Sequence, residues 1–284
     1  MVLNDIKLGY HISTKDIGLF GALKKVFSNK ANVAQIFLRS QKDDIDNFIK
    51  KADIIEAKKF IQKNKMILFS HSLVNIAKRF EDNLFNLNSI IFDMKKLEYL
   101  DGVGVIIHIG DYLNKNKEES YQNIKKSIKF ILKKSPKAIK IIFENAVGYG
   151  TKVGFKFDEL FKIYNLFTLQ EKKRIFFCID TAHSFAAGYD ISNVVGVDNW
   201  FYEIDKYLDW NKVICIHLND SKAEFLSVRD KHADLGYGNI GEKSLCYISQ
   251  MLVDKNISII LEPPQDKISV INQIEMVQQW FKNK

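Results

Sequence analysis

Nine side chains that can bind metal ions or transfer protons follow short apolar runs of the sequence or stand in the polar loop behind the seventh run. They are five histidines, two aspartates and two glutamates: His71, His108, Glu144, Asp180, His183, His217, Asp230, His232 and Glu262. Burying a carboxylate or an imidazole at the end of an apolar strand is costly unless something pairs with it, and a metal ion is the usual partner. A single Asp-x-x-His, as at Asp180 and His183, is weak evidence, because a helix cap with a surface histidine gives the same pattern. The repetition along the chain is what favours a metal site.

The donor types narrow the choice of metal. Imidazole and carboxylate ligands without a thiolate suit Zn²⁺ or Mn²⁺, and nine ligands exceed the coordination of one ion. The set therefore predicts two or three ions. Metal ions about 3.5 to 4 Å apart suit phosphodiester hydrolysis, in which one ion activates a water and the others stabilise the phosphoryl and leaving oxygens.

Eight apolar runs alternate with helical segments and would position these side chains. The predicted strands are residues 6–10, 33–38, 66–69, 103–107, 139–143, 175–179, 213–216 and 257–261. Helices are predicted at 16–27, from the polar turn at 39–42 to about residue 64, and at 75–99, 118–134, 155–169, 200–208 and 242–254. This pattern predicts an α/β fold, a single (β/α)8 TIM barrel with the metal site at the C-terminal face of the strands. An open doubly wound sheet is the alternative, but it gives no reason for ligand-type residues after nearly every strand.

Composition sets the remaining limits. The 284 residues are 46% hydrophobic and 27% charged, which suits one domain over residues 1–284. We find neither a signal peptide nor a membrane span, and expect a soluble intracellular protein, in the cytoplasm or nucleus, or in a viral factory if the source is viral. Cys178 and Cys215 fall inside apolar strands and indicate no disulfide framework. The net charge of +8 favours a polyanionic partner only modestly, because many lysines decorate predicted helices.

Several motifs give the chain a resemblance to a known family. They are CIDTAHSFAAGYD at 178–190, HLNDSK at 217–222, DKHADLGYGNIG at 230–241, EN at 144–145, EP at 262–263 and GYHIS at 9–13. With these, nearly the whole chain resembles the endonuclease IV family of zinc-dependent abasic-site endonucleases.

The resemblance implies a ligand set and a reaction. It implies three Zn²⁺ per chain, with Mn²⁺ as a possible occupant of one site. His71 and His108 would hold one zinc, which Glu144 bridges to a second zinc. The ligands of the second zinc would also include Asp180, His217 and Glu262, and those of the third would be His183, Asp230 and His232. The implied reaction is hydrolysis 5′ to abasic sites in duplex DNA, leaving a 3′-hydroxyl and a 5′-deoxyribose phosphate, with removal of 3′ blocking groups. Glu144 and Glu262 would be catalytic, with Glu262 orienting or deprotonating the attacking hydroxide.

The loops expected to grip DNA depart from the family pattern. The family has an aromatic residue shortly after its first ligand, whereas His71 is followed by Ser72, Leu73, Val74 and Asn75. Tyr149 or Tyr237 could supply a stacking surface instead, and packing within a loop is the competing role for each. The residues predicted to contact DNA are Arg39, Lys42, Tyr149, Lys222 and Lys231. His11 matches a family position that binds no metal, and we expect an orienting or structural role for it.

Two other functions stay open. Related barrels that isomerise or epimerise sugars use a set resembling Glu144, Asp180, His217 and Glu262 around one Mn²⁺. Such an enzyme has no use for the other five ligands. A catalytically silent DNA-binding scaffold is the third hypothesis, and the complete ligand set argues against it. For the nuclease we expect a monomer without membrane contact, with duplex DNA as its partner.

Overall fold

The computed structural model describes residues 6–38, 51–72, 74–112, 116–148 and 150–282. Eight strands follow one another in the order β1-β10-β7-β6-β5-β4-β3-β2 and close into a barrel. Neighbouring strands pair in parallel, as in β1 with β2 and β6 with β7. The predicted TIM-barrel fold is confirmed.

The chain divides into two compact units. Unit 2 comprises Gly9–Phe143 and Ile163–Phe176, and unit 1 comprises the described residues of Met1–Leu8, Glu144–Lys162 and Phe177–Lys284. Strands β5 (Lys140–Glu144) and β6 (Ile175–Asp180) each run from unit 2 into unit 1. The single domain predicted for residues 1–284 stays a prediction.

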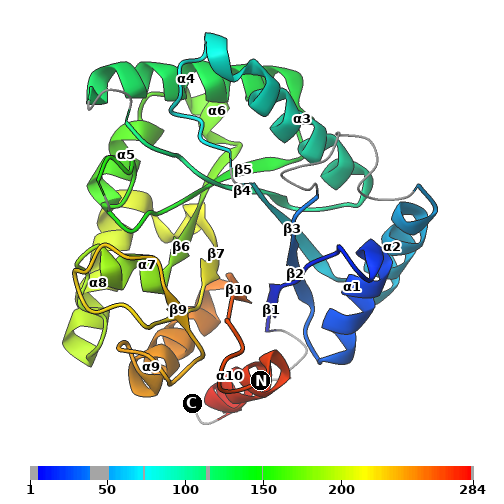
Figure 1. Ribbon diagram of the computed structural model, residues 1–284, viewed down its shortest axis with the longest axis vertical. Coiled ribbons are helices and arrows are strands. Elements are labelled where there is room, and N and C mark those ends of the chain that lie inside the picture. The colour runs from blue at the N-terminus through cyan, green and yellow to red at the C-terminus, as the bar shows by residue number, and fades with distance from the viewer. Residues whose placement is uncertain (1–5, 39–50, 73, 113–115, 149, 283–284) are drawn as a thin grey trace. The chain divides into compact units, whose positions relative to one another are not determined.

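Unit 2 carries the first strands and their helices (Figure 1). Its elements include β1 (Leu8–His11), α1 (Gly18–Ser28), β2 (Val33–Ile36), α2 (Lys51–Asn64), β3 (Ile67–Ser72), η2 (Glu81–Asn83), α3 (Leu84–Tyr99), β4 (Gly104–His108), α4 (Lys117–Lys134) and α6 (Leu169–Lys172). Helix α1 is amphipathic and buries Leu19, Leu23 and Val26 on one face. The Asp53 carboxylate of α2 accepts hydrogen bonds from the backbone N–H groups of Leu19 and Phe20 and so caps α1.

Unit 1 carries the later strands. Its elements include α5 (Phe157–Tyr164), α7 (Thr181–Ala186), α8 (Val194–Leu208), η4 (Trp210–Lys212), β7 (Val213–His217), β8 (Asp220–Ser221), β9 (His232–Ala233), α9 (Glu242–Leu252), η5 (Val253–Lys255), β10 (Ser258–Leu261) and α10 (Val270–Lys282). Strands β8 and β9 form a two-stranded antiparallel sheet.

Several predicted helices have different bounds, for local reasons. The helix predicted at 75–99 begins only at Glu81, because the backbone N–H groups of Ile76 and Ala77 donate to Ile109 O and hold that segment against the end of β4. The helix predicted at 155–169 is two helices, because Thr168 and Glu171 form a capping box that starts α6. Helices α7 and α10 have no counterpart in the prediction, and the loop predicted over 219–241 contains β8 and β9.

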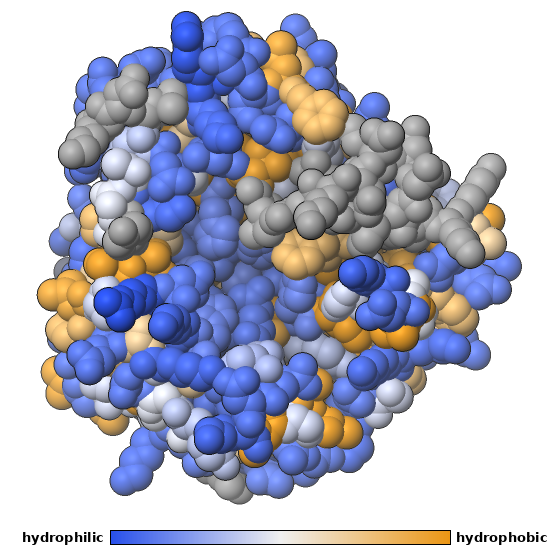
Figure 2. Space-filling view, in the orientation of Figure 1, coloured by the Kyte–Doolittle hydropathy of each residue, from blue (hydrophilic) through white to orange (hydrophobic). Residues whose placement is uncertain are grey.

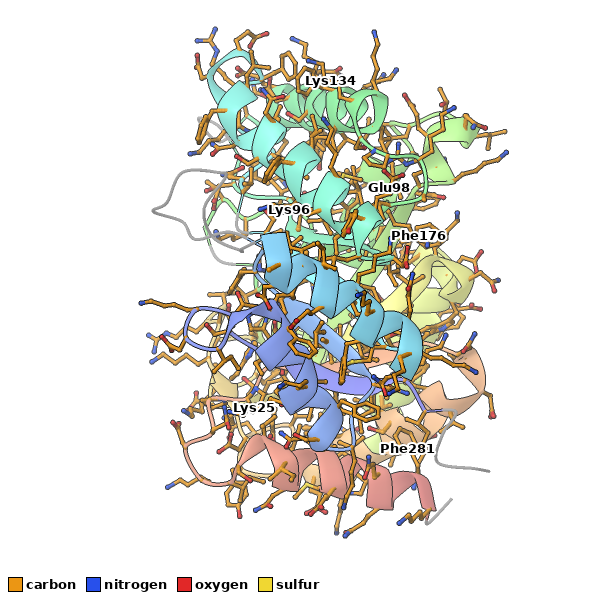
Figure 3. All side chains as sticks on the ribbon, turned by 90° about the vertical axis from the view of Figure 1, so that its right-hand side faces the viewer. Lys25, Lys96, Glu98, Lys134, Phe176 and Phe281 are labelled. Carbon is orange, nitrogen blue, oxygen red and sulfur yellow. The ribbon has the colours of Figure 1, made fainter. Side chains whose placement is uncertain are left out.

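The surface of the helices carries the excess of lysines. Lys25 on α1 and Lys134 on α4, both labelled in Figure 3, are exposed. Lys133, next to Lys134 on α4, also faces solvent, whereas Lys96 on α3 is half-buried with its ammonium over the Phe92 ring. None of the helices in the described ranges is long and apolar enough to cross a bilayer.

Candidate metal centre

The end of β6 places two of the predicted ligands within one helical turn. Strand β6 is almost entirely buried and ends at Asp180, whose Oδ1 accepts a hydrogen bond from His183 N at 2.9 Å and caps α7. All six residues of α7 are buried, so His183 is held in the interior three residues after Asp180. Asp180 is therefore both the cap of α7 and a candidate metal ligand.

Four predicted ligands of unit 1 gather around one point. A ligand atom from each of Glu144, Asp180, His217 and Glu262 lies within 4.8 Å of those of the others. The Nδ1 atom of His217 lies 2.9 Å from Glu144 Oε1, 3.3 Å from Glu262 Oε2 and 3.8 Å from Asp180 Oδ2. Three carboxylates thus face one imidazole nitrogen, and a cation at this point would meet mixed nitrogen and oxygen donors.

A second group shares Asp180 with the first. Asp180, His183 and His232 also place ligand atoms within 4.8 Å of one another. Asp230 Oδ2 lies 3.3 Å from His183 Nε2, and its Oδ1 lies 3.2 Å from His232 Nε2. The Asp230 carboxylate therefore faces both imidazoles, with 53% of its side chain exposed.

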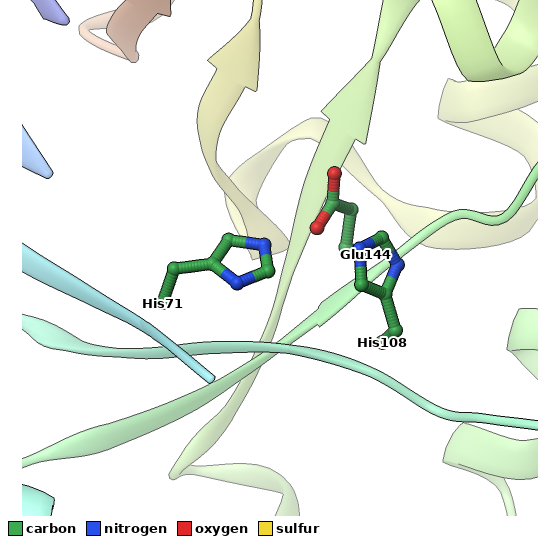
Figure 4. Close-up of side chains that lie close together, drawn as sticks. All are labelled: His71, His108 and Glu144. Carbon is green, nitrogen blue, oxygen red and sulfur yellow. The ribbon is translucent and has the colours of Figure 1, made fainter. Parts of the chain in front are cut away.

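His71 and His108 stand at the ends of β3 and β4, with ring centroids 5.2 Å apart. Figure 4 shows the two imidazoles with the Glu144 carboxylate, and the three residues form the remaining group with ligand atoms within 4.8 Å. Glu144 is the last residue of β5, directly after Phe143 of unit 2. Glu144 is thus common to two groups, as Asp180 is.

The charges of the cluster shift the protonation of its histidines. Burial lowers the pKa of His217, yet the carboxylates of Glu262 and Glu144 outweigh burial and raise the pKa to about 10. The pKa of His232 rises to about 9 in the same way, because Asp180 and Asp230 oppose the effect of burial. Burial raises the pKa of Asp230, but hydrogen bonds with His183 and His232 hold it well below its usual range. Without metal ions, protonated imidazoles thus supply the positive charge that balances the carboxylates, as bound metal cations would.

Two buried asparagines orient the ligands. Asn219 Nδ2 donates to Asp180 Oδ2 at 2.7 Å and to Glu262 Oε2 at 3.3 Å, while its Oδ1 accepts from Glu262 N at 2.8 Å. Asn145 Oδ1 accepts from Asp180 N at 2.7 Å, and its backbone carbonyl lies 2.9 Å from His183 Nδ1. Their role was not predicted, although both belong to the quoted EN and HLNDSK motifs; an asparagine close to a ligand in the sequence is the only signal available.

The donor set fits divalent metal ions. The grouped atoms are imidazole nitrogens and carboxylate oxygens, most of them buried, and three groups that share Glu144 and Asp180 suit neighbouring ions. Cys178, which lies in β6, is buried and its thiol pKa is raised well above normal by burial, so thiolate ligation is not favoured. The assignment of each ligand to an ion stays a prediction.

The residues predicted to contact DNA have mixed positions. Lys222 and Lys231 are exposed at the two ends of the loop between β8 and β9, and Lys222 pairs with Asp266. Arg39, Lys42 and Tyr149 lie outside the described residues. Tyr237 is 56% exposed, so packing within its loop covers less than half of it.

His11 lies at the end of β1 and contacts protein groups. Its Nδ1 lies 3.0 Å from Gln35 Nε2, and its ring packs edge-on against Phe37 with centroids 4.5 Å apart. Because Phe37 in turn packs edge-on against His71, these contacts favour the predicted orienting role.

Comparison with known proteins gives consistent matches. Residues 24–284 match the family described as xylose isomerase-like TIM barrel. A protein of Acanthamoeba polyphaga mimivirus named as a putative endonuclease 4 is 32% identical, with 97% of this chain and 94% of its own length covered. One of Mycoplasma mobile, named as a probable endonuclease 4, is 33% identical over 92% of each chain. The crystal structure of endonuclease IV from Thermus thermophilus superposes with a TM-score of 0.83 at 24% identity, covering 98% of this chain and all of that one.

Proposed function

The chain belongs to the endonuclease IV family of xylose isomerase-like TIM barrels, and from this premise we propose that it hydrolyses the phosphodiester bond 5′ to abasic sites in duplex DNA. The products are a 3′-hydroxyl and a 5′-deoxyribose phosphate, and the same chemistry removes 3′ blocking groups. The supporting observation is the overlap of the three ligand groups through Glu144 and Asp180. A monomer acting on DNA is part of the proposal.

Three Zn²⁺ ions fit the nine ligands, one with His71 and His108, one with Asp180, His217 and Glu262, and one with His183, Asp230 and His232. Glu144 would serve the first two ions together. Bound there, zinc supplies Lewis-acid stabilisation of phosphoryl oxygens and activation of a water.

Residues of the chain itself would orient the attacking water and the metal ligands. Glu262 is the least buried carboxylate of the four-residue group, with 19% of its side chain exposed, and Asn219 fixes it through two hydrogen bonds. It can therefore meet a solvent water, orient it and accept its proton. Asn145 and Asn219 hold Asp180 rigidly, which keeps the geometry constant as negative charge develops on the phosphate.

A duplex with one tetrahydrofuran residue tests the proposal. This abasic analogue has no aldehyde and cannot undergo β-elimination, so only hydrolysis cuts it. We expect a nick on its 5′ side that a DNA polymerase can extend, and loss of the nick with a chelator. An undamaged duplex is the control, and absence of a metal-dependent nick contradicts the proposal.

The four-residue group also suits the alternative of a sugar isomerase or epimerase with one Mn²⁺. That reaction leaves His71, His108, His183, Asp230 and His232 without a role. Conversion of ketohexoses or ketopentoses without cleavage of the duplex would favour it.

A further inference from the structure

The hydroxyl of Thr181 joins the ends of two neighbouring strands. In the register of β6 and β7, Asp180 lies opposite His217, and both strands end at this pair. Thr181 follows Asp180 as the first residue of α7. Its Oγ1 donates to Asn219 O at 2.6 Å, with His217 O at 3.2 Å as a second acceptor, and accepts from Asn219 N at 2.9 Å. One hydroxyl thus continues the link between the two strands beyond the ladder.

The hydrogen bonds of Asn219 return to the metal ligands. Its backbone is held by the residue that follows Asp180, and its side chain donates back to Asp180 Oδ2 at 2.7 Å. The same side chain fixes Glu262 through Oε2 and N. The other oxygen of Asp180, Oδ1, accepts from His183 N. The position of Asp180 relative to Glu262 therefore depends on where the backbone of Asn219 is held.

Thr181 acts from the interior of the protein. It has no exposed surface, Asp180 and His217 are equally buried, and Asn219 is 2% exposed. Thr181 therefore contributes nothing to the mostly hydrophilic face that Figure 2 shows, and it cannot contact DNA itself. A buried backbone group that loses its partner costs more free energy than an exposed one, so the hydroxyl strongly favours this position of Asn219.

We propose that Thr181 is a positioning residue of the metal centre, whose hydroxyl holds the ends of β6 and β7 at the spacing that lets Asp180 serve two ligand groups. This inference rests on the proposed function and adds a residue that does not itself bind metal. Asp180 belongs to two of the three ligand groups, and one of them also contains His217. A shift of Asp180 relative to His217 would therefore weaken both groups.

Three variants test the role of the hydroxyl. Thr181→Val keeps the shape of the side chain and removes the hydroxyl, whereas Thr181→Ser keeps the hydroxyl and removes the methyl group. Tyr189→Phe is the matched control. The Tyr189 hydroxyl also accepts a long-range backbone N–H, that of Phe157 at 3.0 Å, and its ring stacks on Phe157 with centroids 4.4 Å apart.

Zinc affinity is measured by competition with a chromophoric chelator, and the coordination geometry by the visible spectrum of the Co²⁺-loaded protein. We expect Thr181→Val to lower zinc affinity about tenfold and to change the Co²⁺ spectrum, because partners that orient metal ligands contribute about 10- to 100-fold to metal affinity or activity. On the tetrahydrofuran duplex, kcat should fall and KM should stay unchanged. Thr181→Ser should restore the wild-type values, and Tyr189→Phe should lower only thermal stability.

Amide exchange of the wild-type, metal-free protein is a test that needs no variant. The N–H of Asn219 should exchange slowly before zinc is added, because the Thr181 hydroxyl already holds it. Exchange as fast as in an open loop overturns the inference.

Wild-type zinc affinity and Co²⁺ spectrum in Thr181→Val overturn the inference and leave the proposed function intact. Equal losses in Thr181→Val and Thr181→Ser, or in Thr181→Val and Tyr189→Phe, also overturn it, because the hydroxyl would then have no specific effect on the metal centre. Weaker zinc binding in Thr181→Val alone, in a protein whose wild type does not nick the duplex, supports the positioning role and contradicts the proposed reaction.

Discussion

Asn219→Ala perturbs the proposed metal centre without removing a ligand. The substitution removes the hydrogen bonds from Asn219 Nδ2 to Asp180 and Glu262, together with the acceptor for Glu262 N. A hydrogen bond to a charged group contributes about 1.5 to 3 kcal/mol, but bound zinc compensates part of this loss at the carboxylates. Removing groups that orient metal ligands costs about 10- to 100-fold in metal affinity or activity, so we expect a loss of about 2 kcal/mol.

The assay is competition for zinc with a chromophoric chelator, followed by the rate of nicking at a tetrahydrofuran site. Asn83→Ala is the matched control, because Asn83 is also buried and its Nδ2 donates to Asn75 O at 2.8 Å, remote in sequence from every proposed ligand that Asn219 contacts. It should lower thermal stability and leave zinc affinity unchanged. Wild-type zinc affinity in Asn219→Ala, or an equal loss in Asn83→Ala, would refute the orienting role.

Three further outcomes are expected. His183→Ala and Asp230→Ala should each reduce cleavage far more than DNA binding, measured by nicking and by anisotropy, and an equal fall in both would favour the silent scaffold. Because the folded-state pKa values of His217 and His232 are raised to about 10 and about 9, their ion pairs stabilise the metal-free fold at low pH and are lost as pH rises through 9 to 10. Zinc binding at pH 7.5 should therefore release about two protons or more, detected by calorimetry in buffers of different ionisation enthalpy; release of none contradicts the cluster. Asp220→Asn should lower the melting temperature by several degrees, because the buried Asp220 carboxylate accepts five backbone N–H groups, and an unchanged melting temperature would show that they are dispensable.

The strands could be predicted because their apolar runs are short and separated by helical segments. All eight predicted strands overlap observed ones, since a buried parallel strand needs a continuous apolar stretch. The candidate metal site could be predicted from the same apolar runs. Burying ionisable residues at the ends of such runs costs free energy unless a counter-charge is present. Asp180 and His217 illustrate it, as both are fully buried at strand ends.

Short elements near the site could not be predicted from periodicity. Helix α7 has only six residues and all are buried, so it has no polar face to reveal a helical period. Its start depends on the Asp180 side chain, for which the sequence offered a helix cap and a metal ligand as competing roles, whereas the structure shows that the candidate ligand also caps the helix. The left-handed residues Leu226 and Val228 were equally hidden, because neither residue type signals a positive φ.

The contacts of Asp220 also needed the structure. Its carboxylate lies so close to Gly238 that an added Cβ there would come within 2.5 Å of Asp220 Oδ1. The glycines of 236–241 thus permit the loop to wrap around one carboxylate, a long-range requirement that the sequence pattern alone does not express.

The metal content of the purified protein tests the central claim most directly. Elemental analysis by mass spectrometry, normalised to protein concentration, should give about three zinc ions per chain. Replacing Asp180, which two ligand groups share, should lower that number by more than one. A single manganese ion per chain, or no bound divalent metal, would contradict a multinuclear centre.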